Sequence, residues 1–270
     1  MRNLQLRFFL IPTLVAIITI SHGQKIAPTS RGLKPVIIAH RGNHEYFPEN
    51  SMAAIRSAAE IGADYVEIDL RTTRDQQLVL MHDPSVNRTT NGKGLIRKLT
   101  LNQLKSLRLT NSTDTIAYAI PTFREVLAYC RGKIKIYLDF KKADVMQTIR
   151  EIEEEDMTGN IVVYLNDPSE IKTWKSLAPT IPIMLSLPKK SNSLKALIEF
   201  RKEFPADILD GHWSNYNTDM IQYCKEQNIP IWVDVQSPRE NKAYWEPILL
   251  LGFDGLQTDN PEQLIRLIKN

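Results

Sequence analysis

The stretch VIIAHRGNHEYFPENSMAAIRSAAEIGADYVEIDL, residues 36–70, carries the pattern that decides the fold. It opens with a run of β-branched residues and closes with a second apolar run, YVEIDL at residues 65–70. Between the two runs, residues 51–63 show helical periodicity and end near a glycine. Strand, helix and strand in this order predict a βαβ unit whose two strands lie parallel.

The same alternation continues to the C-terminus. The strand-like runs are residues 36–40, 65–70, 135–140, 160–165, 181–187, 207–213, 229–235 and 253–259. The helical patterns are residues 51–63, 122–132, 144–155, 168–178, 193–204, 217–227, 238–252 and 261–270. Alternating units in this number predict an α/β fold of the (β/α)8 TIM-barrel type, and a doubly wound sheet is the weaker alternative.

One further strand-like run, QLVLMHD at residues 77–83, breaks the alternation. Only about three residues separate it from the extended second strand, whereas a parallel crossover needs about a dozen. We therefore expect an antiparallel hairpin excursion after the second strand. This excursion would return His82 to the mouth of the barrel.

The first residues differ in composition from the rest of the 270-residue chain. Arg2 and Arg7 precede an apolar run at residues 8–20, and small residues occupy the −3 and −1 positions of a cleavage site after Gly23. The pattern predicts a signal peptide at residues 1–23, because a run of 13 residues is too short to span a bilayer. An uncleaved N-terminal anchor is the alternative.

Past the cleavage site, the sequence predicts a short lead at residues 24–34 and one barrel domain at residues 35–270, exported to the periplasm or secreted. No stable membrane span is expected after cleavage. Loss of the two leader arginines lowers the formal charge from +3 to +1, so nothing in the charge suggests a nucleic-acid partner. Cys130 and Cys224 lie late in separate predicted helices, and two buried free thiols are favoured over a disulfide. The oligomeric state stays open.

Carboxylates gather where the predicted strands end, which is the catalytic face of this fold. Glu67 and Asp69 are two residues apart, so they point to the same side of the second strand. In an otherwise apolar strand, two carboxylates repel each other and lose solvation unless a cation joins them. A divalent metal would solve both problems, and Asp139 at the same depth of the next strand would supply a third oxygen. An all-oxygen ligand set favours Ca²⁺ or Mg²⁺ over Zn²⁺.

The same strand ends carry histidines and basic residues. His40 ends the first strand and His82 arrives with the hairpin, and an imidazole exchanges protons near neutral pH. Arg41 and Lys141 add positive charge that suits phosphate oxygens. Metal, imidazoles and cations together indicate cleavage of a phosphate ester. The alternatives are structural histidines, edge carboxylates paired with Lys or Arg, and a plain salt bridge between Asp139 and Lys141.

Several motifs resemble the glycerophosphodiester phosphodiesterase family. They are AHRG…PEN at residues 39–50, GADYVEIDLRTTRDQQLVLMHD at 62–83, NRTTNGKG at 87–94, PTFREVL at 121–127, LDFK at 138–141 and GFDGLQTDNP at 252–261. The resemblance covers the chain from about residue 35 to the C-terminus. It implies a barrel, a divalent cation, and hydrolysis of glycerophosphodiesters to glycerol 3-phosphate and an alcohol.

By position, the resemblance implies that His40 and His82 form the acid/base pair. It also implies that Glu67 and Asp69 are metal ligands and that Arg41 contacts the phosphate. The family usually has a glutamate where this chain has Asp139, and Trp-Thr-Val where it has Trp232-Val233-Asp234. These departures bear on the metal and on contacts with the head group more than on the reaction.

Three neighbouring residues receive weaker expectations. Trp232 in the seventh predicted strand is either core packing or a wall for the glycerol or alcohol moiety of the substrate. Glu49 resembles a family position at the rim of the metal site, and its ligation of the metal is left open. His44 is expected on a solvated loop.

Two rivals to this activity remain open in the sequence. The first is a lysophospholipase D or a sphingomyelinase D-like enzyme, which would act on lysophospholipids or related lipids rather than on small-molecule glycerophosphodiesters. The second, of a different class, is a binding protein that keeps the barrel and has lost turnover. The presence of His40, His82, Glu67 and Asp69 argues against this second rival.

Overall fold

The computed structural model describes residues 34–110, 116–188 and 191–269. The strands of its main sheet are β1 (Val36–Ala39), β2 (Tyr65–Thr72), β4 (Lys135–Lys142), β5 (Ile161–Leu165), β6 (Ile183–Ser186), β7 (Ile208–Asp210), β8 (Trp232–Asp234) and β9 (Gly255–Thr258). They pair in parallel in the order β7-β6-β5-β4-β2-β1-β9-β8. Parallel bridges from Leu209 to Ile231 and from His212 to Asp234 join β7 to β8. The ring is thereby closed, and the predicted (β/α)8 barrel is confirmed.

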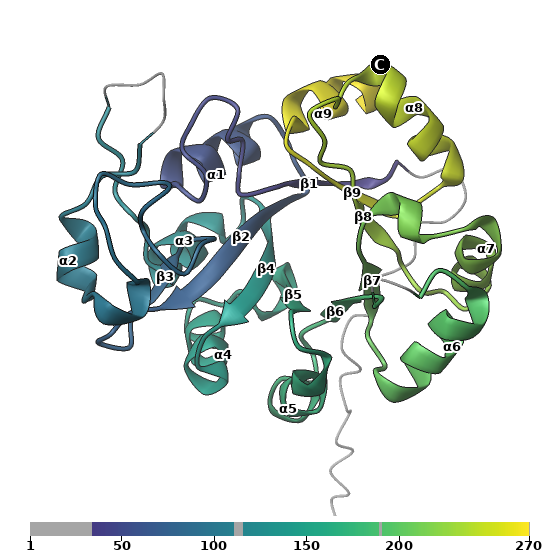
Figure 1. Cartoon of the computed structure of the whole chain (residues 1–270), viewed down its shortest axis with the longest axis horizontal. Helices are drawn as coiled ribbons and strands as arrows, with labels where there is room; N and C mark the ends of the chain where they lie inside the picture. Colours follow the sequence, from purple (N-terminus) through teal and green to yellow (C-terminus); the bar gives the residue numbers. More distant parts are fainter. Residues whose placement is uncertain (1–33, 111–115, 189–190, 270) are drawn as a thin grey trace, which may run out of the picture.

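Helices follow the strands and surround the ring, as Figure 1 shows. They are α1 (Met52–Glu60), α3 (Phe123–Cys130), α4 (Val145–Glu154), α5 (Ile171–Leu177), α6 (Leu194–Glu203), α7 (Thr218–Glu226), α8 (Lys242–Leu251) and α9 (Pro261–Lys269). Capping side chains define the starts of most of them, because these side chains accept hydrogen bonds from backbone N–H groups that the first turn leaves free. Ser51 caps α1 in this way. Asn241 caps α8, which therefore begins later than the predicted helix at residues 238–252.

The ninth strand-like run forms a short excursion on the side of the barrel. Strand β3 (Leu78–Leu80) pairs antiparallel with the end of β2, and a short helix, α2 (Leu101–Lys105), lies beyond it in Figure 1. The sequence analysis missed α2, which a capping box of Thr100 and Gln103 starts. The excursion has an apolar cluster of its own, made of Val79, Met81, Val86, Ile96, Leu104, Leu109 and Ile120. This cluster fixes the path of the chain on either side of His82.

Inward-facing side chains change character along the barrel axis. The deeper layer is apolar and aromatic and contains Ile38, Tyr65, Tyr137, Val162, Met184, Ile208 and Trp232. Two residues further along several of these strands, the inward positions carry Glu67, Asp139 and Asp210. Outward residues of the same strands, such as Ile68 and Leu138, belong to the main core. The barrel is therefore sealed below and polar at its carboxyl end.

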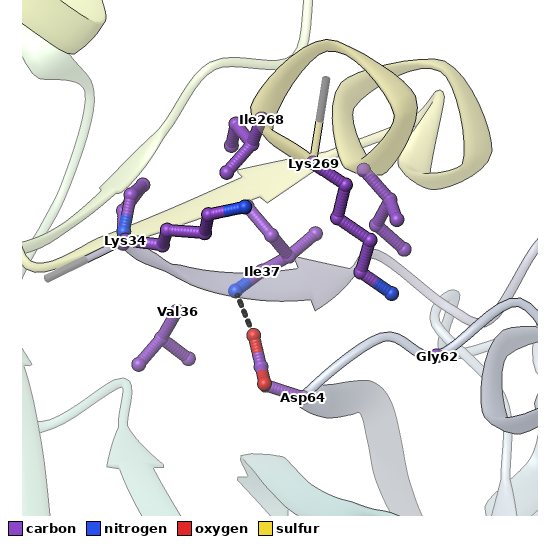
Figure 2. Close-up of a pocket in the computed structure, with 9 residues that line it drawn as sticks. Lys34, Val36, Ile37, Gly62, Asp64, Ile268 and Lys269 are labelled. Carbon is purple, nitrogen blue, oxygen red and sulfur yellow. Dashed lines mark hydrogen bonds between the residues drawn. The ribbon is translucent and has the colours of Figure 1, made fainter.

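The amino end of the barrel is built differently. A hollow of about 180 Å³ lies there between β1 and α9, and Ile37, Ile265 and Ile268 contribute to its lining. Figure 2 shows Asp64 directed at the backbone of Ile37, whose N–H it accepts at 2.8 Å. The catalytic groups of this fold lie at the opposite face, and the amino end contributes stability. Asp64 does so by tying the start of β2 to β1.

The predicted signal peptide at residues 1–23, and the lead up to residue 33, lie outside the described residues. Among the helices that the structure describes, none combines the length and the apolar character needed to cross a bilayer. Cys130 and Cys224 are buried free thiols, as the sequence predicts. Burial raises the pKa of each thiol to about 12.

Candidate active site at the carboxyl end of the barrel

Three carboxylates meet inside the mouth of the barrel. Glu67 and Asp69 project from β2, and Asp139 lies directly opposite Asp69 on β4. One oxygen of each lies within 4.8 Å of the others, and Glu67 and Asp69 are 3% and 1% exposed. The structure thus brings together the three ligands that the sequence analysis proposed.

The pKa values of the three carboxyl groups show that they repel one another. Burial, followed by the charges of Asp69 and Asp139, raises the pKa of Glu67 well above its ordinary value. Burial and the charge of Asp69 likewise raise the pKa of Asp139. Burial also acts on Asp69, but Lys141 and Arg41 outweigh it, so the pKa of this carboxyl is lowered. A cation bound among the three carboxylates would remove the repulsion that raises the pKa of Glu67.

Lys141 is the basic residue closest to this group on β4. Its Nζ lies 3.1 Å from Oδ1 of Asp69 and also contacts Asp139. Asn166, just past β5, donates to the other oxygen of Asp139 at 2.6 Å. Asp139 therefore has both the salt bridge and the place in the carboxylate group that the sequence analysis treated as alternatives.

Arg41 follows β1 with a positive φ of 53°. Its backbone N–H donates to Oε2 of Glu67 at 2.8 Å, and its Nε lies 3.4 Å from Oδ2 of Asp69. Gly42 continues the turn with a φ of 85°, and a Cβ here would lie 2.7 Å from the carbonyl carbon of Ala54. The glycine is required both for its conformation and for the close approach to α1.

His40 sits beside the carboxylate group and is oriented from β9. Its Nδ1 is 2.6 Å from Oδ1 of Asp259, and its Nε2 is 4.0 Å from Oε2 of Glu67. Because a carboxylate only accepts, Nδ1 carries the proton in this bond and Nε2 faces the site. Burial raises the pKa of Asp259, but the hydrogen bonds from His40 and His44 outweigh it and lower the pKa.

His44 lies in the turn after β1 with its side chain 28% exposed, as expected of a loop residue, and it also makes a contact that was not expected. Its Nε2 lies 2.9 Å from the same oxygen of Asp259 that His40 contacts, and its ring is 5.8 Å from that of His40. This contact joins residues 215 positions apart, so sequence spacing does not show it. Asp259 thus holds two histidines.

His82 follows β3 and is anchored through its backbone and its ring. The guanidinium of Arg71 on β2 donates to the carbonyl oxygen of His82, from Nε at 2.9 Å. The Nδ1 atom of His82 lies 2.8 Å from Oδ1 of Asp83. As with His40, a carboxylate orients Nδ1 and leaves Nε2 for other contacts. The charge of His82, after those of Lys141 and Arg41 and the hydrogen bond from Asn50, helps to lower the pKa of Asp69.

The rim beside His82 is an ion-pair network. Arg88 donates to both oxygens of Glu49 at 2.7 and 2.9 Å and to both oxygens of Asp83 at 2.8 and 3.0 Å. Arg41 also donates to Glu49, at 3.1 Å. Glu49 is therefore occupied by two guanidinium groups and lies outside the carboxylate group of the described structure. A polar hollow of about 200 Å³, which His44 also lines, opens beside it.

Asn50 has a role that its position before a helix did not reveal. It is buried with a φ of 56°, and its amide donates to Oδ2 of Asp69 at 2.7 Å. The backbone N–H of Asp69 donates in return to the amide oxygen at 3.1 Å. Ser51 is the helix cap, so Asn50 is free to hold the carboxylate.

Trp232 lies away from the surface of the mouth. It is 2% exposed, and its ring packs against Tyr65 in the deeper layer at a centroid distance of 4.9 Å. The close approach of Gly255 completes this packing, since a Cβ there would lie 2.6 Å from the indole. The structure thus places Trp232 in the core, which is one of the two alternatives that the sequence left open, and its contact with substrate stays a prediction. Asp234, the next inward residue of β8, reaches the mouth instead.

These groups define the kind of chemistry that the mouth supports. Two imidazoles that carboxylates hold at Nδ1 can move protons through Nε2, and Arg41 and Lys141 present fixed positive charge beside a carboxylate group. The barrel places all of them at its carboxyl end, where enzymes of this fold carry their active sites. The class is thus a barrel hydrolase acting on phosphate esters.

Comparison with known proteins gives the family. Residues 40–263 match the model of the glycerophosphoryl diester phosphodiesterase family. A glycerophosphodiester phosphodiesterase from Caldanaerobacter subterraneus subsp. tengcongensis is 28% identical over 246 residues, which cover 88% of this chain and 99% of that protein. Human glycerophosphodiester phosphodiesterase 1 is 45% identical over a shorter stretch of 111 residues, 38% of this chain and 33% of that protein.

Solved structures agree at the level of the fold. An Oleispira antarctica phosphodiesterase, solved in complex with the product sn-glycerol-3-phosphate, is 22% identical with a TM-score of 0.77 and covers 87% of this chain and 97% of its own. A glycerophosphodiester phosphodiesterase from Agrobacterium tumefaciens has a TM-score of 0.75 at 22% identity, over 86% of this chain and 100% of its own. The chain belongs to the glycerophosphoryl diester phosphodiesterase family, a family of phosphoric diester hydrolases.

Proposed function

We propose that this protein hydrolyses glycerophosphodiesters to glycerol 3-phosphate and an alcohol, with a divalent cation as cofactor. The observation that carries the proposal is the group of Glu67, Asp69 and Asp139, whose oxygens converge within 4.8 Å beside His40. The Oleispira relative was solved in complex with the product sn-glycerol-3-phosphate, which supports the same product here. The lipid-specific and non-catalytic alternatives receive no support from the relatives named above.

The donor set fits a hard cation. Glu67, Asp69 and Asp139 offer only carboxylate oxygens, which suit Ca²⁺ or Mg²⁺. Their repulsion, visible in the raised pKa of Glu67, gives the site a physical reason to take up positive charge. When bound, such an ion polarises a phosphate oxygen and stabilises the charge that develops on it.

The side chains of the chain itself supply the rest of the reaction. Arg41 and Lys141 hold the phosphate oxygens and their developing charge. One histidine takes the proton of the attacking oxygen as the new P–O bond forms, and the other protonates the alcohol as its P–O bond breaks. The attacking oxygen belongs either to water or to the 2-hydroxyl of glycerol. Only attack by the 2-hydroxyl passes through a cyclic phosphate intermediate, which water then opens.

A substrate panel tests this function. The protein is first treated with EDTA to remove metal ions and is then assayed without and with added Ca²⁺ or Mg²⁺. The substrates are glycerophosphocholine, glycerophosphoethanolamine, glycerophosphoinositol and lysophosphatidylcholine. We expect release of glycerol 3-phosphate, measured with glycerol-3-phosphate dehydrogenase, only when a cation is present. Release of choline and lysophosphatidate from lysophosphatidylcholine alone, measured as free choline, would instead establish a lipid phosphodiesterase. No hydrolysis of any substrate would contradict the proposal.

We also propose export, which rests only on the N-terminal sequence. The apolar run at residues 8–20 after Arg2 and Arg7, and the cleavage pattern at Gly23, support it. Expression of the full chain in a secreting host, followed by N-terminal sequencing of the recovered protein, tests it. A mature terminus at Gln24 is expected, and an intact terminus on membrane-bound protein would favour the anchor.

A further inference from the structure

Opposite the carboxylate group, the barrel mouth has a second set of inward polar side chains. Ser186 and Asp210 lie opposite each other on β6 and β7, and Asp234 lies opposite Gln257 on β8 and β9. We call these four residues the acceptor wall. Tyr137 on β4, two residues before Asp139, donates its hydroxyl to Asp210 at 3.2 Å. The acceptor wall and the metal-ligand group therefore share one mouth.

The carboxylates of the acceptor wall have neutral partners. Asp210 accepts from the hydroxyls of Tyr137 and Ser186, the latter at 2.7 Å, and Asp234 accepts from the amide of Gln257 at 2.6 Å. Among the described residues, neither aspartate forms an ion pair with Lys, Arg or His within 4.0 Å. This differs from Asp69 on the other side of the mouth, which Lys141 neutralises at 3.1 Å.

Gln257 gives an independent sign that the wall is incomplete. The residue is 6% exposed, and its Oε1 has no hydrogen-bond partner among the described residues. Its amide nitrogen is fixed on Asp234, so the orphaned atom is an acceptor. A buried acceptor without a donor costs free energy, and a ligand that brings an N–H or O–H group removes that cost. Asp234 is partly exposed, so a ligand in the mouth can reach the acceptor wall at this residue.

Charge distinguishes between the donors that would fit. Burial, followed by the charge of Asp234, raises the pKa of Asp210 well above its ordinary value. A hydroxyl group would satisfy Gln257 but leave the two aspartates repelling each other. A quaternary ammonium would relieve the repulsion but has no N–H to donate. A primary ammonium does both.

We propose that the acceptor wall binds a primary ammonium group on the alcohol moiety of the substrate, so that ethanolamine-type diesters are preferred. The inference rests on the proposed function, which places the phosphate beside Arg41 and Lys141 and beside the cation that the carboxylate group would hold. Asp234 supplies the charge and Gln257 the orphaned acceptor, while Ser186 and Asp210 complete the wall behind them. Choline esters would keep only the charge interaction with the acceptor wall, and polyol esters only the hydrogen bond to Gln257.

The test compares alcohols that share one glycerophosphate. We measure kcat/KM of the cation-loaded protein for glycerophosphoethanolamine, glycerophosphocholine and glycerophosphoglycerol. A preference of about tenfold or more for the ethanolamine ester is expected, and Asp234→Asn, which keeps the shape, should remove most of it. Asp219→Asn on the exposed surface of α7 is the matched control and should keep the preference.

Two outcomes would overturn the inference. One is an unchanged ratio between the substrates in Asp234→Asn, with thermal melting showing the variant folded. The other is an equal loss for all three diesters, which would assign Asp234 to the shared glycerol part. If no diester is hydrolysed, the proposed function fails, and calorimetry with phosphoethanolamine and phosphocholine still decides the inference. Tighter binding of phosphoethanolamine that Asp234→Asn abolishes would support it, and equal binding would contradict it.

Discussion

At the scale of single residues, a carboxylate orients each of the two histidines proposed for proton transfer. His40 and His82 come from different strands, yet each has its Nδ1 atom on a carboxylate, Asp259 in one case and Asp83 in the other. The bond fixes the ring and aims Nε2 away from that partner. The paired arrangement is the geometric basis for assigning both histidines to proton transfer.

Replacing either histidine tests this assignment directly. We expect His40→Ala and His82→Ala each to lower kcat by about 100-fold or more, because general acid or base catalysis contributes that much. Steady-state kinetics on glycerophosphoethanolamine provide the measurement. His212→Ala, an exposed histidine bonded to Ser214, serves as control. Rates near wild type in either active-site variant would remove that residue from the reaction.

At the scale of elements, the hairpin of β2 and β3 determines where His82 lies. Leu70 pairs with Leu80, so the chain leaves β3 beside the carboxyl end of β2. The guanidinium of Arg71 then holds the carbonyl oxygen of His82. A register shift of one residue in this pair would turn every side chain of β3 to the opposite face.

The guanidinium of Arg71 therefore positions the imidazole of His82 indirectly, through the backbone carbonyl oxygen of that residue. We expect Arg71→Met to lower kcat by about 10- to 100-fold, because small displacements of a catalytic group have effects of this size. KM should change less than kcat, and Arg71→Lys should restore part of the loss. Loss of kcat with an equally large drop in melting temperature would indicate a structural role only.

The sequence predicts the parts of this architecture that depend on local spacing. The barrel follows from alternating strand and helix patterns, and the pairing of Glu67 with Asp69 follows from the two-residue repeat of a strand. Contacts between distant positions are different. Asp259 reaches His40 across 219 positions, and Asn166 reaches Asp139 across 27. The motif GFDGLQTDNP contained Asp259, but only the closed ring shows which side chain it meets.

Whole-molecule stability should respond to the cation. Binding to the folded state alone stabilises it by about 2.7 kcal/mol when the free ion is at 100 times its Kd. Chelation should therefore lower the melting temperature, and Ca²⁺ or Mg²⁺ should restore it. We expect Glu67→Gln to abolish this response, and Glu246→Gln, on the exposed face of α8, to keep it. A melting temperature independent of both ions would argue against the carboxylate group as a metal site.

The acceptor wall links stability to pH. Asp210 holds its proton more tightly in the folded than in the unfolded chain, since burial and Asp234 raise its pKa. The contribution of this group to the free energy of unfolding is complete below about pH 4, the pKa in the unfolded chain. It is lost as the pH rises through the pKa in the folded chain.

In the variant Asp210→Asn the side chain at this position cannot titrate, so the variant should not lose this contribution as the pH rises. Between pH 5 and pH 8, its free energy of unfolding in urea should fall less than that of wild type by about 1.4 kcal/mol for each pH unit of raised pKa within the window. Asp219→Asn should follow the wild-type curve. Identical pH dependence in wild type and Asp210→Asn would show that the carboxyl titrates normally.

Along the sequence, the residues proposed for hydrolysis and those proposed to bind the alcohol lie in different halves of the barrel. The proposed metal ligands, both histidines, Arg41 and Lys141 all precede residue 142, with Asp259 as the distant support. The acceptor wall is encoded later, on β6 to β9. Mutant libraries confined to the last four strands would therefore vary the accepted alcohol while leaving the hydrolytic groups untouched. The protein thus offers a natural half-barrel boundary for directed evolution of substrate choice.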